Sequence, residues 1–218
     1  MKKILLIVTA IMLCSSAFCA DIDSLKKAAE QGDVRAQFNL GLVYSFGDGV
    51  PQDYKESVRW YRKAAEQGDA KAQLRLGSAY SSGQGVPQDY KESVKWYRKA
   101  AEQGDANAQV HLGSAYSNGR GVLQDYKESV KWYRKAAEQG DAYAHLHLGV
   151  IYSYGQGVPQ DYAEAYFWAN ISAIENPSSA SLRDEIAAKL TLSKTEEVQA
   201  RCKKWLEDFE KRKALKRP

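Results

Sequence analysis

The sequence predicts an all-α fold, an α/α superhelical solenoid built from helix-turn-helix repeats. The tripeptide Gln-Gly-Asp recurs with a period of 36 residues, at 31–33, 67–69, 103–105 and 139–141. Two successive units, residues 69–104 and 105–140, differ at only six positions. Each unit holds two stretches in which apolar residues recur at helical spacing, separated by a glycine-rich loop. Units of this length with two helices are typical of solenoids, in which neighbouring units share one core.

The first helix of a unit is clearest in residues 69–104. Asp69 is the expected N-cap, and Ala72 and Leu76 follow at helical spacing. Gly77 lies in the middle of this helix, where glycine costs up to about 1 kcal/mol relative to alanine. Glycine recurs at the same place in the other units, as Gly41, Gly113 and Gly149. We therefore expect another helix to approach closely there.

The second helix of the unit follows a loop over residues 81–87, whose glycines and proline break the first helix. Asp89 with Glu92 three residues later is an acidic variant of the capping box. The predicted core-facing residues of this helix are Val94, Trp96, Tyr97, Ala100 and Ala101. Because the aromatic residues repeat with the scaffold, we interpret them as core rather than as a cofactor site.

The segments that flank the repeats are expected to be caps, because terminal repeats need a polar outer face. Ser193 with Glu196 is a second capping-box candidate, and it predicts a helix that runs to about Lys211. The predicted organisation is a signal peptide (1–20), an N-terminal capping helix (21–32), three repeats (33–68, 69–104 and 105–140), a divergent fourth repeat (141–176), and C-terminal capping helices with a basic tail (177–218).

Three motifs of the second unit have counterparts in the others: Ala70-x-Ala72-Gln73-x-x-Leu76-Gly77-x-x-Tyr80, Gly83-x-Gly85-Val86-Pro87-Gln88-Asp89-Tyr90 and Trp96-Tyr97-Arg98-Lys99-Ala100-Ala101-Glu102-Gln103-Gly104. The pattern resembles the Sel-1-like repeat family, which is related to the tetratricopeptide repeat. The resemblance covers residues 33 to about 175. It implies that the first helix of each unit lies on the concave side of a superhelix, where partners bind.

The units differ from one another mainly on one face of their first helices. The variable positions are spaced by four, three and four residues, which places them on a single helical face. From this face we predict ten partner-binding residues: Arg35, Asn39, Phe46, Lys71, Arg75, Asn107, His111, Tyr143, His147 and Tyr154. The alternative interpretation is free variation of solvent positions. The aromatic residues in the set favour the interpretation that this face binds a partner.

The first twenty residues have the layout of a secretory signal peptide, with Lys2-Lys3, an apolar run over residues 4–13, and small residues up to Ala20. The apolar run is about half of the ~20 residues that a spanning helix needs, so a membrane anchor is the less favoured interpretation. A lipoprotein signal fits poorly, because Phe18 precedes Cys19. We expect cleavage near Cys19 or Ala20, a periplasmic or secreted protein, and no transmembrane span after cleavage.

The formal charge of +4 is unevenly distributed along the chain. The signal segment contributes +2 and the tail from Lys203 onward contributes +4, and subtracting both leaves −2 for residues 21–202. Because the net charge of residues 21–202 is close to zero, unselective nucleic-acid binding, which needs a basic face, is not expected. We interpret the basic tail as a frayed, solubilising end, with contact to an anionic lipid or acidic partner as the alternative.

Catalytic motifs are sparse. The three histidines, His111, His145 and His147, are not accompanied by a His-Glu-x-x-His or a paired Cys-x-x-Cys pattern, so no metal site is expected. Ser24-Leu25-Lys26-Lys27 matches Ser-x-x-Lys of penicillin-interacting enzymes, and some cysteine-rich members of the resembled family are described as β-lactamases. Ser-Asp-Asn and Lys-Thr-Gly are absent. After cleavage only Cys202 remains, and helical spacing predicts that it is buried.

The sequence therefore predicts an exported, non-catalytic scaffold that binds a protein or peptide partner of unknown identity through its first helices. We expect a monomer without cofactor, metal or nucleic acid. Two alternatives from other classes stay open: a periplasmic β-lactamase-like hydrolase, and a binder of peptidoglycan fragments or saccharide.

Overall fold

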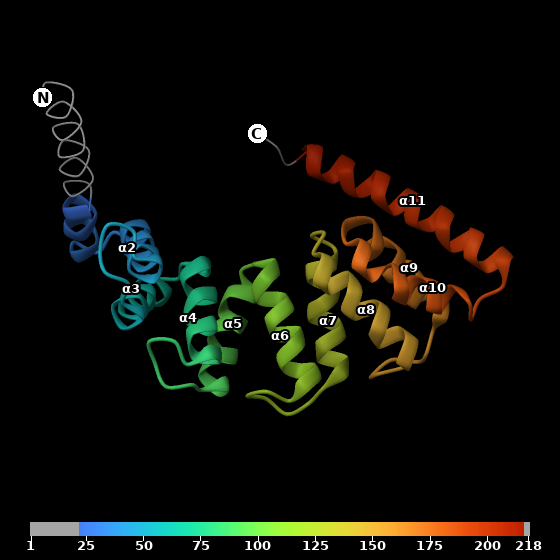
Figure 1. Ribbon diagram of the computed structural model, residues 1–218, viewed down its shortest axis with the longest axis horizontal. Helices are drawn as coiled ribbons and strands as arrows, with labels where there is room; N and C mark the ends of the chain where they lie inside the picture. Colours follow the sequence, from blue (N-terminus) through green and yellow to red (C-terminus); the bar gives the residue numbers. More distant parts are fainter. Residues whose placement is uncertain (1–21, 216–218) are drawn as a thin grey trace, which may run out of the picture. The chain divides into compact units, whose positions relative to one another are not determined.

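The structure is a computed structural model that describes residues 22–215, apart from the side chain at position 175. The described residues form stacked helix pairs, which confirms the all-α solenoid prediction (Figure 1). They fall into two compact units, Met1–Gln103 (unit 1) and Gly104–Pro218 (unit 2), and each unit is described by itself. The predicted signal peptide and the last three residues of the tail lie outside the described residues. Within residues 22–215, no helix is both long and apolar enough to span a membrane.

The described part of unit 1 consists of a helix over residues 22–30 followed by two helix pairs. The first pair is α2 (Val34–Phe46) with α3 (Tyr54–Glu66), and the second is α4 (Ala70–Ser82) with α5 (Tyr90–Glu102). The pairs stack because α3 also packs against α4. We call the first helix of each pair helix A and the second helix B.

Unit 2 contains two further pairs and two closing helices (Figure 1). The pairs are α6 (Ala106–Asn118) with α7 (Tyr126–Ala137), and α8 (Ala142–Tyr154) with α9 (Tyr162–Glu175). After the 3₁₀ turn η1 (Pro177–Ser179), the closing helices α10 (Ala180–Ala187) and α11 (Leu192–Leu215) both pack against α9.

Aspartate starts every helix of the four pairs. The residues before the A helices are Asp33, Asp69, Asp105 and Asp141, and in each the side chain accepts a hydrogen bond from the backbone N–H three residues later. At the B helices, the aspartate accepts from two backbone N–H groups. These bonds satisfy donors that would otherwise lack a partner at the helix start. The N-cap prediction for Asp69 and Asp89 is confirmed.

A capping box also requires the Glu92 side chain to accept a hydrogen bond from the backbone N–H of Asp89, and this part of the prediction is wrong. The backbone N–H of Asp89 donates to the carbonyl of Tyr80 at 2.9 Å, so it is not available to Glu92. Glu92 pairs instead with Lys95 on the same helix. The second predicted capping box, Ser193 with Glu196, is also wrong, because α11 begins at Leu192 and Ser193 lies inside its first turn. The side chain of Thr191 accepts from the N–H of Lys194 and acts as the cap.

A glutamine in each loop between helices A and B fixes the loop to its own helix pair. Its side-chain amide donates to a serine carbonyl at the end of helix A and to the tyrosine hydroxyl that opens helix B. The pairs are Gln52 with Ser45 and Tyr54, Gln88 with Ser81 and Tyr90, Gln124 with Ser117 and Tyr126, and Gln160 with Ser153 and Tyr162.

In the first three pairs, the repeated glycine in helix A makes room for a tyrosine ring of helix B. A Cβ atom added to Gly41 would lie 2.5 Å from the ring of Tyr61, and one added to Gly77 would lie 2.7 Å from the ring of Tyr97. The close approach predicted for these glycines is therefore confirmed, and a side chain makes it. Beside each glycine lies a fully buried leucine: Leu40, Leu76, Leu112 or Leu148.

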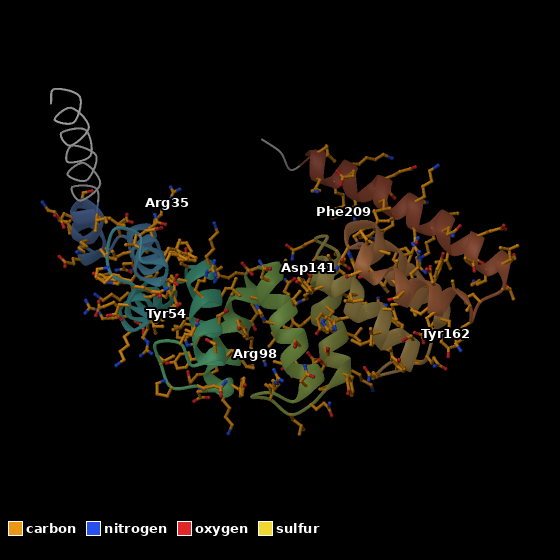
Figure 2. All side chains as sticks on the ribbon, in the orientation of Figure 1. Arg35, Tyr54, Arg98, Asp141, Tyr162 and Phe209 are labelled. Carbon is orange, nitrogen blue, oxygen red and sulfur yellow. The ribbon has the colours of Figure 1, made fainter. Side chains whose placement is uncertain are left out.

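The last pair is closed by the aromatic face of α11. Trp205 makes edge-to-face contacts with Phe167 and Trp168 of α9, at centroid distances of 6.3 Å. Phe209, labelled in Figure 2, stacks on Trp205 at 5.1 Å. Cys202 is buried below them as predicted, with its Sγ 3.6 Å from the carbonyl oxygen of Phe167. Burial raises the pKa of this thiol, so it packs as a small apolar group.

Candidate functional site

The predicted partner-binding residues lie on the helix A faces that point away from the core. In α2 the buried residues are Ala36, Gln37, Leu40 and Gly41. Arg35, Asn39 and Phe46 project from the opposite side of that helix. The same division holds in the other A helices. We refer to the five predicted residues of unit 1 as the unit 1 strip (Arg35, Asn39, Phe46, Lys71 and Arg75) and to those of unit 2 as the unit 2 strip (Asn107, His111, Tyr143, His147 and Tyr154).

The unit 1 strip is basic. Arg35, Lys71 and Arg75 are exposed, and Figure 2 labels Arg35 where it extends from α2. Phe46 ends α2 with 64% of its surface exposed, whereas Asn39 is half-buried between them. Neither α2 nor α4 contains an aspartate or glutamate. This face therefore combines positive charge with one exposed aromatic ring.

A small cavity of about 90 Å³ opens beside Arg75. Hydroxyl-bearing residues from three helices line it together with Arg75; they are Ser45, Tyr54, Ser57, Tyr61 and Ser78. Burial raises the pKa of Tyr61, while hydrogen bonds to serine and the charge of Arg75 act in the opposite direction. The cavity is polar and lies next to a cation, which suits a small anionic group.

The unit 2 strip is aromatic and carries no permanent charge. Tyr143 and Tyr154 expose 68% and 66% of their surfaces, and Asn107 and His111 are also exposed. His147 is half-buried, and its ring stacks on Tyr133 with 4.8 Å between centroids and 13° between planes. His147 is therefore partly a packing residue, and a ligand reaches less of it than of the tyrosines.

Both histidines of this strip favour the neutral form. Burial lowers the pKa of His147, and the Asp141 carboxylate opposes that shift. Desolvation by the surrounding protein also lowers the pKa of His111, against the carboxylates of Asp105 and Asp141. His111 is exposed to water on one side, so its desolvation comes from the atoms on the other. Near pH 7 the unit 2 strip is thus uncharged.

Tyr154 also borders a cavity of about 240 Å³ at the end of the last pair. Its other walls include Tyr162 from α9, Leu182 and Ile186 from α10, and Lys189 from the turn that follows α10. This arrangement gives the exposed ring of Tyr154 an adjoining space with both apolar and charged walls. A sequence comparison between repeats could not show it, because α10 is outside the repeats.

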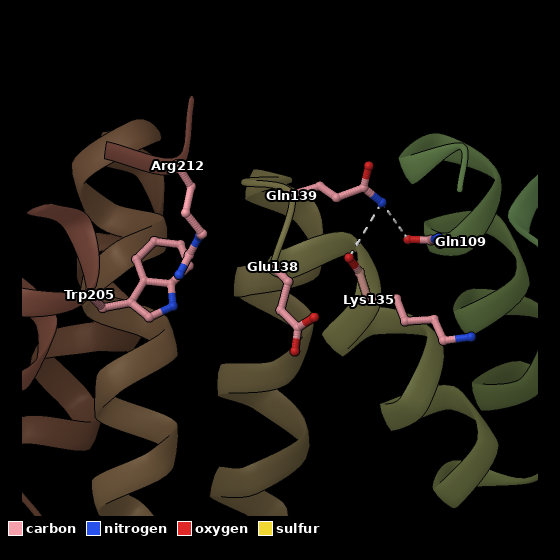
Figure 3. Close-up of a pocket in the computed structure, with 6 residues that line it drawn as sticks. All are labelled: Gln109, Lys135, Glu138, Gln139, Trp205 and Arg212. Carbon is pink, nitrogen blue, oxygen red and sulfur yellow. Dashed lines mark hydrogen bonds between the residues drawn. The ribbon is translucent and has the colours of Figure 1, made fainter. Parts of the chain in front are cut away.

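A wider groove of about 590 Å³ lies between α7 and α11 (Figure 3). Glu138 stands between Trp205 and Arg212 on one side and Gln109 and Gln139 on the other. Gln139 donates a hydrogen bond to Gln109 at 2.9 Å, which fixes that wall. This groove was not predicted from the sequence, in which its only signal is Trp205 at helical spacing in the C-terminal segment.

Residues 22–215 contain no group of three or more His, Cys, Asp or Glu side chains that could hold a metal ion. His145 is buried, with its Nε2 3.0 Å from the Ala137 carbonyl oxygen and its ring near Trp168 and Trp205. It is a core residue. Ser24 is exposed within the helix over residues 22–30.

Comparison with known families gives a match over most of the chain. The family described as Sel1 repeat matches residues 25–33, 34–69, 70–105, 106–141 and 142–176. No curated protein matches the chain.

Two solved structures of bacterial proteins are similar to this one. The c5321 protein, a protective antigen of uropathogenic Escherichia coli strains that displays an SLR fold, is 48% identical with a TM-score of 0.69. The match covers 70% of this chain and 33% of that one. A Sel1 repeat protein from Oxalobacter formigenes is 44% identical with a TM-score of 0.67, covering 70% of this chain and 63% of that one. The chain thus spans a third of the first protein and less than two thirds of the second.

Proposed function

Since the chain belongs to the Sel1 repeat (SLR) family, we propose that it is a non-catalytic scaffold that binds a protein or peptide through the outward faces of its A helices. The observation that supports this proposal is the exposure of Tyr143 and Tyr154. Both rings stand more than half exposed on α8, a helix without a single Asp, Glu, Lys or Arg. Exposed tyrosines on a rigid helix are favourable anchors, because they bury much area at low entropic cost.

The opposite face of the helix pairs is less suited to a partner. On α3 and α5, Arg59 pairs with Glu56 and Lys95 with Glu92. Lys63 and Lys99 lie over the rings of Trp60 and Trp96, at 4.2 and 4.1 Å. These side chains already have intramolecular contacts, so binding there would have to replace them.

A photo-crosslinking amino acid at single positions tests this proposal in living cells. We place it at Tyr143 on the helix A face, and at Lys91 on α5 as the control on the helix B face. Crosslinks to a protein at position 143 but not at position 91 support the proposal. Crosslinks at position 91 alone contradict it.

We also propose that the protein acts in the periplasm or outside the cell, as the signal-peptide pattern of residues 1–20 predicts. Fractionation of cells that carry the full chain tests this. A mature protein that starts near Cys19 or Ala20 in the periplasm or medium is expected, and an uncleaved cytoplasmic protein contradicts it.

The hydrolase alternative depends on Ser24 and Lys27, and the sequence lacks the Ser-Asp-Asn and Lys-Thr-Gly motifs that would accompany them. We expect no turnover of a chromogenic β-lactam by the purified protein. Turnover that is lost on Ser24→Ala would replace the scaffold proposal.

A saccharide or peptidoglycan fragment is the second candidate ligand, and the groove beside α11 favours it. Trp205 supplies an aromatic ring there, and Gln139 and Glu138 supply planar polar groups that suit sugar hydroxyls. Titration with purified muropeptides, followed by the fluorescence of the protein, distinguishes this ligand from a peptide. The alanine variant of Trp205 should lose any such binding.

A further inference from the structure

The outward face of α2 and α4 in unit 1 carries three cations and no acid. Arg35, Lys71 and Arg75 are exposed, and the two helices contain no aspartate or glutamate. The nearest acids in the chain are the N-caps Asp33 and Asp69, whose carboxylates accept hydrogen bonds from backbone N–H groups. The strip therefore carries three positive charges, which the two N-cap carboxylates offset only in part.

These three cations have no ionic partner among residues 22–215. Lys71 and Arg75 are four residues apart on the same helix face, an arrangement in which like charges repel. An anion bound between or beside them would remove this repulsion. The helix B face differs, because Glu56 and Glu92 are within reach of its cations.

The cavity beside Arg75 provides a place for one anionic group. Its volume of about 90 Å³ is several times the ~10–15 Å³ that one water molecule needs on the same measure, so it has room for a side-chain carboxylate. The guanidinium of Arg75 can donate two parallel hydrogen bonds to such a group. Ser45, Ser78 and Tyr61 add hydroxyls to the lining.

Phe46 supplies the apolar part of the same surface. It ends α2, exposes 64% of its area and belongs to the same helix face as Arg35. A ligand that is complementary to this face combines carboxylates with an aliphatic or aromatic side chain.

We infer that the face of α2 and α4 binds an acidic peptide segment, with one of its carboxylates held by Arg75 in the adjoining cavity. This inference rests on the proposed scaffold function and names the chemistry of its partner in unit 1. A nucleic acid fits less well, because three cations cannot follow a phosphate backbone and the body of the chain has a charge of −2.

Fluorescence anisotropy with synthetic peptides tests the inference on the full chain after removal of its signal peptide. The peptides have the same length and each contains one tryptophan. They differ at one set of positions, which are all glutamate, all glutamine or all lysine. Arg75→Gln and Lys71→Gln remove cations of the strip. Lys91→Gln removes one exposed cation from α5 and is the matched control, since it changes the net charge equally.

Binding of the glutamate peptide, weakened about tenfold by Arg75→Gln and unchanged by Lys91→Gln, supports the inference. Higher salt should weaken it further. Equal binding of the glutamine or lysine peptide overturns it, as does preferential binding to phosphatidylglycerol vesicles. If the neutral peptide binds and Tyr143→Ala abolishes that binding, the inference fails while the scaffold proposal stands. If a peptide binds with the same affinity to every strip variant, both the inference and the scaffold proposal fail.

Discussion

The imidazole of His147 stacks on the ring of Tyr133, with 4.8 Å between their centroids. This contact joins helix A of one pair to helix B of the pair before it, since His147 lies on α8 and Tyr133 on α7. It makes a residue of the unit 2 strip part of the packing between repeats. The state of this histidine therefore affects the stability of unit 2 as well as its surface.

Acidification is expected to destabilise the protein through His147. Its folded-state pKa is below the ordinary value of 6.5, so below that pH the unfolded chain binds a proton that the folded chain does not. The contribution is complete above about pH 6.5 and is lost as the pH falls toward the folded-state pKa. Between neutral and mildly acidic pH, the free energy of urea unfolding should therefore fall less in His147→Gln than in the unsubstituted protein. An identical pH dependence of the two proteins would contradict this assignment.

Alanine at Gly41 is expected to destabilise unit 1. Its Cβ would lie 2.5 Å from the ring of Tyr61, so the ring must move, at a cost of about 1–3 kcal/mol. Gly149 is the matched control, because Tyr61 has no counterpart in the last pair and the nearest atom to a new Cβ is 3.3 Å away. Gly149→Ala should be less costly, since alanine also favours the helix by up to about 1 kcal/mol. Thermal unfolding measures both, and equal costs would argue against the tyrosine contact.

The buried amide of Gln73 is expected to be essential to the joint between α4 and the ends of α3 and α5. It donates to the Ala65 carbonyl at 3.1 Å and accepts from Gln103 at 2.8 Å. Gln73→Leu leaves these groups without their partner and should cost about 1–3 kcal/mol. Gln73→His should be milder, because His145 occupies the equivalent position in α8 and contacts the Ala137 carbonyl with Nε2. A histidine variant as unstable as the leucine variant in urea unfolding would refute this equivalence.

The repeating features of the fold could be predicted from the sequence, because identical local chemistry recurs at each unit. Asp69 and Asp89 cap helices through short-range bonds, so their position next to an apolar run was sufficient. The partner of Glu92 could not be predicted, since the N–H of Asp89 is taken by a carbonyl across the loop. The Gln73–Gln103 bond was missed for a similar reason: it joins residues 30 positions apart whose types are equally common on surfaces.

The outward positions of the strips followed from helical spacing alone, and eight of the ten residues are exposed. Asn39 and His147 are half-buried, and the His147 ring stacks on Tyr133 of α7, a contact that a single-helix pattern does not include. The cavities beside Arg75 and Tyr154 depend on how α4 and α10 pack against their neighbours. Such spaces are a property of the tertiary arrangement, and no periodicity encodes them.

The affinity of the crosslinked partner for the Tyr143→Ala/Tyr154→Ala double variant tests the central claim most directly. Leu123→Ala, which removes an exposed apolar side chain from the loop before α7, is the control. We predict that the double variant folds with an unchanged melting temperature and binds at least about tenfold more weakly, while the control binds normally. A folded double variant with unchanged affinity would contradict the claim that the A helices form the binding surface.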